Sequence, residues 1–364
     1  MLRSIHIENF RALREFRMSG LGRVNLLVGT NNCGKTSVLE AINVLARPGD
    51  LRPFLQSLLR RGEIADNNGD FVEIRHTIHG HRVVEGSGFS VRASNDDVET
   101  GVRAWLTPRW SDGPPSAEEI ERALNEAPDA DEAFEPSSLQ FRLEWRRSDE
   151  SPIQRDMVVM AGGGVARRQR NAMPDEPINE RVQYISTDGL TRDEVVSLFD
   201  RTVLTPDEAV VMDALRTIEP TIERLASVSS RTARTFRRGG IDMLVAGEKL
   251  PVGTMGDGIW RLLGVALALV RARGGILLVD EIDTGLHYTV LTKMWRLVFE
   301  TATRLDVQVF ATTHSRDCYE ALAEVTDPER REISLQRIER GKAEAVSYRE
   351  GVLRKAAEHG IEVR

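Results

Sequence analysis

The stretch that decides the fold is LVGTNNCGKTS, residues 27–37. It matches the pattern G-x-x-x-x-G-K-[ST], with Gly29 and Gly34 at its two glycine positions. Lys35 and Thr36 complete the pattern. Glycines in such a loop let the backbone wrap around phosphate oxygens, and the helix that follows points its free N–H groups at them. The lysine neutralises the β- and γ-phosphates, and the hydroxyl binds Mg²⁺, so the stretch predicts a site for a nucleoside triphosphate.

The segments on either side of this loop have the pattern that such a site requires. VNLLVG, residues 24–29, is a continuous apolar run typical of a buried strand, and KTSVLEAINVLAR, residues 35–47, has apolar residues at helical spacing. We therefore predict that ATP and Mg²⁺ bind here, with Lys35 as a catalytic residue and Thr36 as a metal ligand. The predicted contacts with the nucleotide are Gly29, Thr30, Asn31, Asn32, Cys33, Gly34, Lys35, Thr36 and Ser37.

A second cluster of functional residues lies in GGILLVDEIDTGLH, residues 274–287. Residues 276–279 are apolar and predict a buried strand that ends at Asp280 and Glu281. Ligands of open α/β sheets bind outside the carboxyl ends of the strands. We predict that Asp280 holds Mg²⁺ and that Glu281 polarises the water that attacks the γ-phosphate. An acidic turn after a core strand is the alternative for this segment, but the loop at 29–36 favours the catalytic interpretation.

A histidine follows the next predicted strand. In FATTHS, residues 310–315, an apolar segment ends at two threonines and His314. This strand comes directly after the Asp-Glu unit, so His314 is expected at the same edge of the sheet, close to a γ-phosphate. We predict that His314 donates a hydrogen bond to a phosphoryl oxygen as charge builds there. A structural or exposed histidine is the alternative.

Composition and charge narrow the class of protein. The chain has 364 residues and a formal net charge of −7, so no overall basic field attracts it to nucleic acid or anionic membrane. The longest apolar run, residues 262–270, is too short to cross a bilayer, and the first ten residues have a strand pattern and not that of a signal peptide. Cys33 and Cys318 make no disulfide framework. We expect a cytoplasmic protein without membrane segments.

The order of predicted elements indicates an α/β fold. Residues 274–315 have the β-α-β pattern of a parallel sheet, and residues 72–93 have the short alternating pattern of antiparallel strands. The composition between about 96 and 180 is more variable, with the acidic, proline-rich segment 111–137. We predict a central, mostly parallel sheet flanked by helices, an antiparallel β subdomain and an inserted variable region. The longest predicted helical stretch covers 206–227.

The ordered series of motifs resembles the ABC-type ATPases of the SMC/RecF/OLD group, a class of P-loop NTPases, and is most similar to compact ATPases of the OLD family. The motifs that carry the resemblance are NFR (9–11), VGTNNCGKTSVLEAI (28–42), ILLVDEIDTGLH (276–287) and ATTHS (311–315). The resemblance implies a single ABC-type ATPase domain over 1–364, with a core of 1–95 and 180–364 and an insertion at about 96–180. It also implies a homodimer or higher homo-oligomer with nucleotide at the interface.

The same resemblance assigns further nucleotide contacts. TMGDGIWR, residues 254–261, lies where the family has the signature loop that faces the partner's γ-phosphate. It departs from the usual Leu-Ser-Gly-Gly-Gln pattern, because Gly256 replaces the serine and Asp257 replaces a glycine, while Gly258 is kept. A plain glycine-rich turn into a core helix is the alternative. The resemblance further places Asp283 in the loop that crosses the dimer interface, and it places Asn9 and Arg11 near the nucleotide.

Features that the sequence lacks shape the functional prediction. No segment has the long heptad repeats of an SMC coiled coil, and the residues after His314 are too few for the TOPRIM nuclease domain of full OLD proteins. We therefore expect an ATPase without its own nuclease. The resemblance implies a switch that self-associates around ATP and controls a separate effector in anti-phage defence, and a TOPRIM nuclease is one candidate effector.

The alternative is a RecF-like, ATP-dependent DNA-binding clamp. A scaffold with degenerate ATPase machinery is disfavoured by the intact phosphate loop and Asp-Glu pair. Two arginine-rich segments, 166–170 and 229–240, leave contact with nucleic acid open, although solvated surface is the simpler interpretation. For the acidic segment 111–137, a partner-docking element and a disordered surface loop both stay open.

Overall fold

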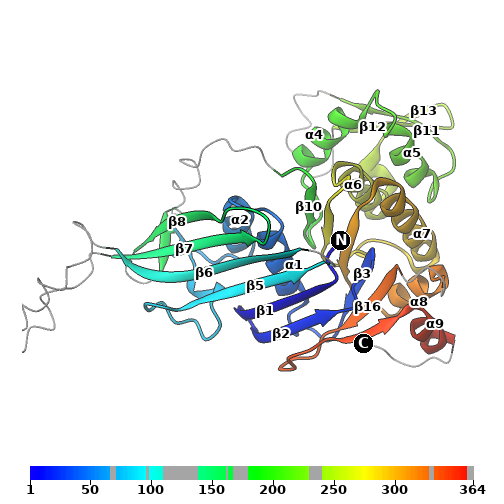
Figure 1. Ribbon diagram of the computed structural model, residues 1–364. Helices are drawn as coiled ribbons and strands as arrows, with labels where there is room; N and C mark the ends of the chain where they lie inside the picture. The colour runs from blue at the N-terminus through cyan, green and yellow to red at the C-terminus, as the bar shows by residue number, and fades with distance from the viewer. Residues whose placement is uncertain are drawn as a thin grey trace, which may run out of the picture.

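The computed structural model describes residues 1–65, 71–95, 98–109, 138–160, 163–166, 179–228, 240–327 and 332–358. The acidic segment 111–137 lies outside the described residues, and so do residues 167–170 and 229–239, which carry most of the two arginine-rich segments. Within the described ranges, no helix combines the length and apolar character that a bilayer span requires. Figure 1 shows two large sheets, one beside the other, and a smaller layer of helices and strands above them.

The central sheet has six strands in the order β10-β14-β15-β3-β16-β17, and only β17 is antiparallel to its neighbour. This confirms the predicted mostly parallel sheet. All residues of β3 and β15 are buried, which explains their continuous apolar sequences. The strands are β3 (Val24–Val28), β10 (Val182–Ile185), β14 (Ile276–Val279), β15 (Gln308–Thr312), β16 (Ile333–Arg337) and β17 (Val346–Arg349).

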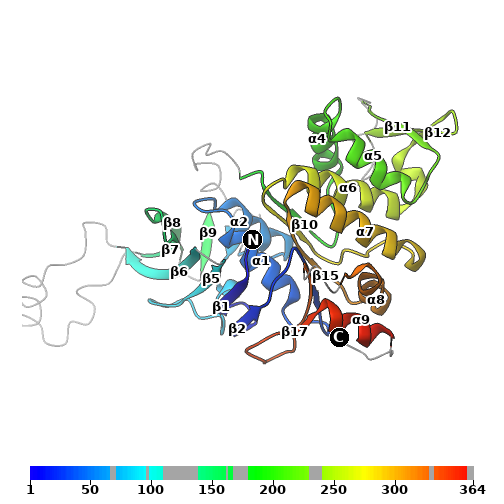
Figure 2. The same cartoon turned by 45° about the vertical axis from the view of Figure 1, so that its right-hand side comes forward.

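Helices cover both faces of the central sheet because successive residues of each strand point to opposite sides. Leu278 and Phe310 belong to the core beneath α1, whereas Leu277 and Val309 belong to the core beneath α6, α7 and α8. Figure 2 shows α1 on one side of β10 and β15 and α6 and α7 on the other. The helices are α1 (Lys35–Leu45), α6 (Asp257–Arg271), α7 (Tyr288–Leu305), α8 (Arg316–Val325) and α9 (Glu350–Glu358).

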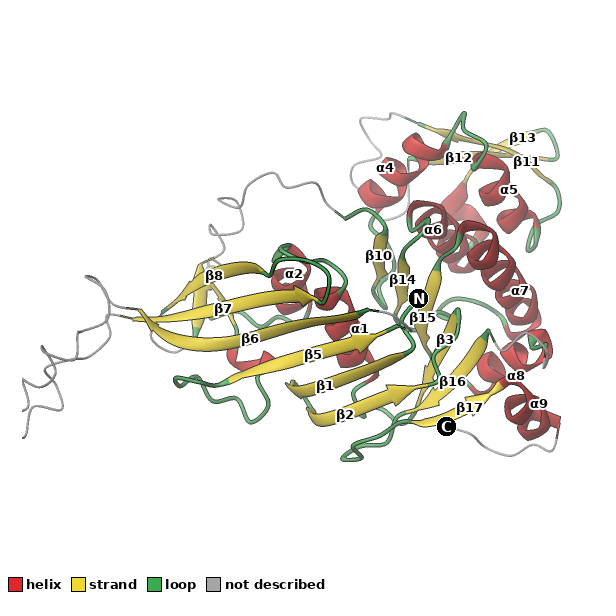
Figure 3. Cartoon of the chain, viewed as in Figure 1, coloured by secondary structure: helices red, strands yellow, loops and turns green. Residues whose placement is uncertain are grey.

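The second sheet has eight strands in the order β2-β1-β5-β6-β7-β8-β9-β4, antiparallel throughout (Figure 3). Its buried face packs on α1 and α2 (Arg52–Arg60), where the Phe54 and Phe141 rings stack 5.7 Å apart. The Trp145 indole donates a hydrogen bond to the Val44 carbonyl of α1 at 2.9 Å. The strands are β1 (Ser4–Phe10), β2 (Leu13–Ser19), β4 (Phe71–Glu73), β5 (Gly88–Ser94), β6 (Glu99–Arg109), β7 (Ser138–Arg147), β8 (Ile153–Val159) and β9 (Gly164–Ala166).

Two predictions about the organisation of the chain differ from the structure. The boundary predicted at 95/96 runs through a hydrogen-bonded pair of strands, since β5 and β6 pair from Gly88↔Trp105 to Ser94↔Glu99. The strands of segment 96–180 therefore belong to the same sheet as β1, because their alternating apolar residues complete its buried face. The helix predicted over 206–227 ends early: α5 covers Glu208–Arg216, and Ile222–Ser227 is strand β11. Pro220 lies between them and disfavours helical backbone at the residue before it.

A small three-stranded sheet covers α6. This helix lies between the small sheet and the central sheet and contributes side chains to the cores of both. The strands of the small sheet, β11, β12 (Ile241–Val245) and β13 (Glu248–Pro251), are antiparallel and pack with α4 (Arg192–Thr202) and α5 against α6. A capping box at Thr191 and Glu194 fixes the start of α4. The parallel strands β3, β10, β14 and β15 end at one edge of the central sheet, so the loops after them meet there.

Candidate functional site

The loop between β3 and α1 has the backbone that phosphate binding requires. Gly29 and Gly34 have φ of 145° and 108°, values that side-chain-bearing residues rarely adopt. A Cβ atom at Gly29 would come 2.2 Å from the Ile338 carbonyl oxygen, so no other residue fits there. Gly34 is the N-cap of α1 and has no side chain to cap it, and the first N–H groups of α1 are therefore directed at the space above the loop.

Lys35 lies beneath this loop and is 5% exposed. Its Nζ donates to the carbonyl oxygens of Gly29 at 2.7 Å and Thr30 at 3.0 Å. Nζ also lies 3.3 Å from Nδ1 of His314. Burial lowers the pKa of Lys35, while the Cys33 sulfur and the carboxylates of the site oppose that shift. The ammonium is therefore a poorly solvated cation at the base of an anion-binding loop, where a phosphate gains most from it.

The Asp280 carboxylate gathers hydroxyl groups from three separate segments. Thr36 Oγ1 lies 3.0 Å from Oδ2, Thr312 Oγ1 lies 2.6 Å from Oδ1, and Thr187 Oγ1 lies 3.2 Å from Oδ2. The structure thus brings the two predicted metal ligands, Thr36 and Asp280, into direct contact. A carboxylate surrounded by hydroxyl oxygens is a donor set that suits Mg²⁺, which prefers oxygen ligands. The residues present fit a magnesium ion bound together with phosphate oxygens.

The next residue, Glu281, has a backbone conformation that sets its side-chain direction. Its φ is 49°, in the left-handed region that is uncommon for residues other than glycine, and such conformations often occur at functional sites. Its N–H donates to Thr312 Oγ1 at 2.8 Å, which links it to the residue that also holds Asp280. The carboxylate is partly exposed, and Oε1 lies 3.5 Å from Nε2 of His314.

His314 therefore lies between Lys35 and Glu281. Burial lowers its pKa, and the charge of Lys35 lowers it further. A histidine with a lowered pKa is neutral at pH 7, and a lysine ammonium can only donate hydrogen bonds. Nδ1 must then accept from Lys35, which leaves the ring proton on Nε2, facing Glu281. Five predicted residues, Lys35, Thr36, Asp280, Glu281 and His314, are thus brought together around one point.

The loop predicted to cross an interface and the signature segment lie beside each other. Asp283 Oδ1 accepts a hydrogen bond from Thr313 Oγ1 at 2.7 Å, so the loop after Glu281 is tied to the residue before His314. Gly256, with φ of 89°, caps α6, and a Cβ atom at Gly258 would come 3.0 Å from the Gly285 carbonyl oxygen. Gly256 and Asp257 are exposed and begin the helix.

The two N-terminal residues predicted near the nucleotide, Asn9 and Arg11, lie where β1 turns into β2. The Arg11 guanidinium is buried, with Nε 2.6 Å from Glu40 and Nη1 2.6 Å from Glu63. It therefore neutralises a carboxylate of α1 and one that follows α2, and its contact with the nucleotide stays a prediction. Asn9, near the end of β1, and Arg11, in the turn that follows it, both have positive φ, 56° and 53°. The Asn9 carbonyl accepts from the His79 N–H at 2.9 Å.

Two further residues at this site, Thr187 and Arg261, were not predicted. Thr187 follows β10, which is parallel to β14, so its hydroxyl reaches Asp280. The signal available in the sequence was a polar residue directly after the apolar run VQYIS. Arg261 lies in α6 and donates to the Asp280 carbonyl oxygen at 2.6 Å. A lone arginine in an apolar helix gave no such signal.

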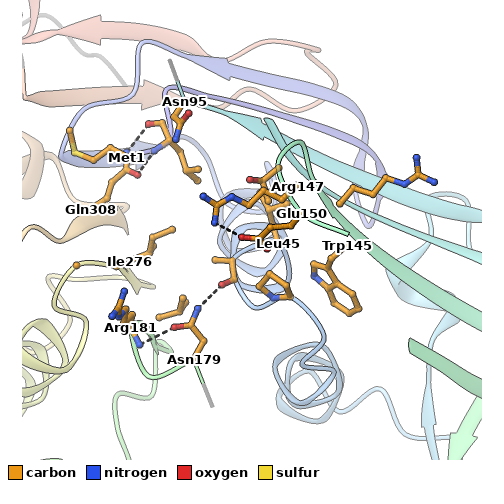
Figure 4. A pocket seen from close by; sticks show the side chains of 18 of the residues that line it. Met1, Leu45, Asn95, Trp145, Arg147, Glu150, Asn179, Arg181, Ile276 and Gln308 are labelled. Atoms are coloured by element: carbon orange, nitrogen blue, oxygen red, sulfur yellow. Dashed lines mark hydrogen bonds and ion pairs between the residues drawn. The ribbon is translucent and has the colours of Figure 1, made fainter. Parts of the chain in front are cut away.

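A cavity of about 380 Å³ lies elsewhere, where the two large sheets meet. Its lining includes Ile276 and Gln308, at the amino ends of β14 and β15, and therefore the end of the sheet away from the phosphate loop. Figure 4 shows that its polar groups pair with each other: the Gln308 amide bonds the backbone of Leu2, and Arg147 pairs with Glu150. Arg147 and the Gln308 amide are thus already paired, and the cavity is separate from the phosphate loop.

Two protein families match separate parts of the chain. Residues 1–84 match the family described as "AAA ATPase domain". Residues 189–317 match the family described as "AAA domain, putative AbiEii toxin, Type IV TA system". The first match contains the phosphate loop, and the second contains Asp280, Glu281 and His314, so the two halves of the site come from the two matched segments.

Similar curated proteins are distant or match over short stretches. An ATP/GTP phosphatase of Helicobacter pylori is 20% identical over 365 residues, covering 89% of this chain and 88% of the relative. The DNA replication and repair protein RecF of Idiomarina loihiensis is 26% identical over 117 residues, 30% of this chain and 33% of the relative. An uncharacterised protein of Methanocaldococcus jannaschii is 48% identical over 42 residues, 12% of this chain and 19% of the relative.

Among solved structures, an Smc head domain derived from Pyrococcus furiosus, with an extended coiled coil and bound to the C-terminal domain of ScpA, has the same fold. It aligns over 99% of both chains with a TM-score of 0.50 and 12% sequence identity. The predicted fold class is thereby confirmed. Among the described helices α7 is the longest, at 18 residues. The chain therefore has the P-loop fold of ABC-type ATPase heads, and two of its segments match AAA ATPase families.

Proposed function

We propose that this protein binds ATP with Mg²⁺, hydrolyses it slowly and uses the nucleotide to control self-association and a separate effector protein. The observation that carries the proposal is the convergence of Lys35 and Thr36 on Asp280, Glu281 and His314. Thr36 Oγ1 is 3.0 Å from Asp280, and His314 is 3.3 Å from Lys35 and 3.5 Å from Glu281. These groups supply a phosphate cradle, a metal site, a base and a phosphoryl-oxygen donor around one point.

The chemical step assigns one task to each side chain. The oxygen of a water forms a bond to the γ-phosphorus while Glu281 takes its proton, and the bond from that phosphorus to the bridging oxygen breaks. The electron pair of the broken bond stays on the β-phosphate of ADP, next to the Lys35 ammonium. His314 donates its Nε2 proton in a hydrogen bond to a γ-phosphoryl oxygen as charge develops. Thr36 and Asp280 would hold Mg²⁺, which supplies charge neutralisation at the phosphates.

Self-association is supported by the surface next to this site. Gly256 and Asp257 are exposed at the start of α6, and the loop that contains Asp283 and Gly285 lies directly against them. Free N–H groups at a helix start bind anions, so a second copy can approach the γ-phosphate of the first with this surface. The Asp257 carboxylate weakens that attraction, and we expect association to depend strongly on Mg²⁺ and on low to moderate salt.

A role in controlling an effector is supported by the motif series, which resembles OLD-type ATPases, and by the matched family whose description names a toxin–antitoxin system. We propose anti-phage defence as the setting and a separate nuclease, such as a TOPRIM protein, as the effector. ATP binding closes the interface, and hydrolysis or an external trigger rearranges it. The partial RecF match favours a second candidate, an ATP-dependent DNA-binding clamp.

The test is ATP turnover and oligomeric state measured on the same samples. We expect the wild-type protein to release phosphate slowly, and the variant Glu281→Gln to bind ATP without turnover and to form an oligomer visible by mass photometry. Lys35→Ala is the matched control, because it removes nucleotide binding and should stay in the nucleotide-free state. A wild-type protein that binds no ATP would refute the proposal. Tight, salt-sensitive binding to duplex ends or gaps would replace the switch with the clamp.

A further inference from the structure

Arg261 makes an unusual set of contacts for a residue of an apolar helix. It is 6% exposed and lies in the second turn of α6. Its Nη1 donates to the Ser186 carbonyl oxygen at 2.9 Å, and its Nη2 donates to those of Asp280 at 2.6 Å and Glu281 at 2.9 Å. These carbonyls lie just beyond β10 and β14. Those of Ser186 and Glu281 also accept turn hydrogen bonds from the Gly189 and Thr284 N–H groups, so the guanidinium adds a second donor to each turn.

The carbonyls that Arg261 holds belong to the residues that carry the chemistry. Glu281 is the proposed base, and its φ of 49° needs support from its surroundings. Ser186 precedes Thr187, whose hydroxyl contacts Asp280. One planar guanidinium therefore holds both the turn after β10 and the turn after β14. Burial lowers the pKa of Arg261, but the nearby carboxylates of Asp280, Asp283 and Glu281 oppose the shift, so the group stays a cation.

Arg261 also connects this site to the exposed start of its own helix. The first turn of α6 packs closely on the loop after Glu281, because a Cβ atom at Gly258 would come 3.0 Å from the Gly285 oxygen and one at Gly285 would come 3.0 Å from Asp257. A shift of α6 along its axis therefore pushes on Gly285, through Asp257 and Gly258, and moves the loop that follows Glu281. The start of α6 is the surface that the proposed function presents to a second copy.

We propose that Arg261 is a positioning residue that sets the Glu281 carboxylate for attack and couples its position to whatever binds at the start of α6. The inference rests on the proposed function. A lysine at this position keeps the charge but cannot hold three carbonyls in a planar fork. Without the planar guanidinium, the Glu281 carboxylate is displaced slightly from its position for attack. The phosphate loop, Thr36 and Asp280 keep their own contacts.

The test is a double-mutant cycle between Arg261→Lys and Glu281→Gln. We expect Arg261→Lys to bind a fluorescent ATP analogue with a Kd within about twofold of wild type and to lose about 100-fold in kcat, the size expected from a misplaced catalytic group. In the Glu281→Gln background, the same substitution should change the residual kcat by less than about twofold, because the group it positions is already absent.

Arg47→Lys is the matched control. Arg47 is a half-buried arginine, and it donates to the Val182 carbonyl oxygen, at the other end of β10, at 2.6 Å. This control should lower the melting temperature but keep kcat. A folded Arg261→Lys variant with wild-type kcat would overturn the inference, and so would a loss that is additive with Glu281→Gln.

Arg261→Gln, which keeps one donor group, provides a second variant if the lysine variant does not fold. Failure of both variants to fold would also overturn the inference, because the arginine would then serve the fold and not the base. A wild-type protein without ATP turnover would instead refute the proposed function. The two failures are therefore distinguishable.

Discussion

The Lys35 ammonium and Nδ1 of His314 lie 3.3 Å apart, although 279 positions of sequence separate the two residues. Since lysine can only donate, this contact fixes the histidine as the acceptor and places its ring proton on Nε2, toward Glu281. Lys35, His314 and Glu281 therefore form a series of contacts that leads from the phosphate loop to the proposed general base. His314 and the hydroxyls around the neighbouring Asp280 carboxylate give three of the predictions below, and Arg11 gives the fourth.

The first prediction concerns His314. We expect His314→Ala to lower kcat by about 100-fold, because a donor to the developing phosphoryl charge is lost, with little change in ATP affinity. Steady-state phosphate release and equilibrium binding of labelled ATP measure the two quantities. An unchanged kcat would show that the histidine serves only as a neighbour of Lys35.

The second prediction concerns pH. Because burial and Lys35 lower the pKa of His314 below its ordinary value of 6.5, the folded protein stays unprotonated at this ring where the unfolded chain already binds a proton. Stability from this group is therefore complete above pH 6.5 and is lost as the pH falls from there toward the folded-state pKa. The melting temperature of wild type should therefore fall relative to that of His314→Gln, measured in the same buffers, as the pH falls from 6.5. A relative rise of the wild-type melting temperature on acidification would contradict the assigned direction.

The third prediction concerns the hydroxyls around Asp280. Thr312 donates to the carboxylate at 2.6 Å and also accepts the Glu281 N–H, so it orients a metal ligand without being one. We expect Thr312→Val to raise the Mg²⁺ concentration needed for half-maximal turnover by about 10- to 100-fold, as is usual for such partners of metal ligands. Thr187→Val is the matched control. Thr187 is exposed and its hydrogen bond to Asp280 is longer, at 3.2 Å, so its loss should raise the required Mg²⁺ concentration less. Equal effects of the two variants would exclude this ranking.

The fourth prediction separates structure from chemistry at Arg11. Removing one member of a buried ion pair leaves a charge without its partner, so Arg11→Met should lower the free energy of unfolding by about 3–5 kcal/mol. We expect ATP affinity of the folded variant to match wild type, because Arg11 contacts Glu40 and Glu63 and not the loop. Denaturant unfolding and ATP binding are the measurements. Weaker ATP binding with normal stability would restore the nucleotide contact expected from the resemblance.

The sequence predicted the strand ends better than the side chains that support them. Lys35, Thr36, Asp280, Glu281 and His314 were predicted because each follows or begins an apolar run whose period and length are local properties. The parallel sheet then brings them together, since strands of one direction end at one edge. The same argument extends to Thr187, but only once β10 is known to pair with β14.

Residues whose partners are distant in sequence could not be predicted this way. Arg11 looked like a ligand of an anion, but its partners Glu40 and Glu63 become neighbours only through the packing of the β1–β2 turn on α1 and α2. Arg261 lies in a helix whose sequence is otherwise apolar, and its carbonyl partners leave no mark on side-chain chemistry. The strands of segment 96–180 were not predicted to belong to the same eight-stranded sheet as β1, because β5 and β6 pair across a change in composition.

The place of β3 in the central sheet has a consequence for synthesis on the ribosome. This strand, which leads into the phosphate loop, is bounded on both sides by β15 and β16, and Asn25 reaches a carbonyl 284 positions later, that of Val309. A growing chain therefore exposes two unpaired edges of β3 until its last third has emerged. A chain that stops before β15 also lacks His314, so it cannot complete the group of side chains around Lys35.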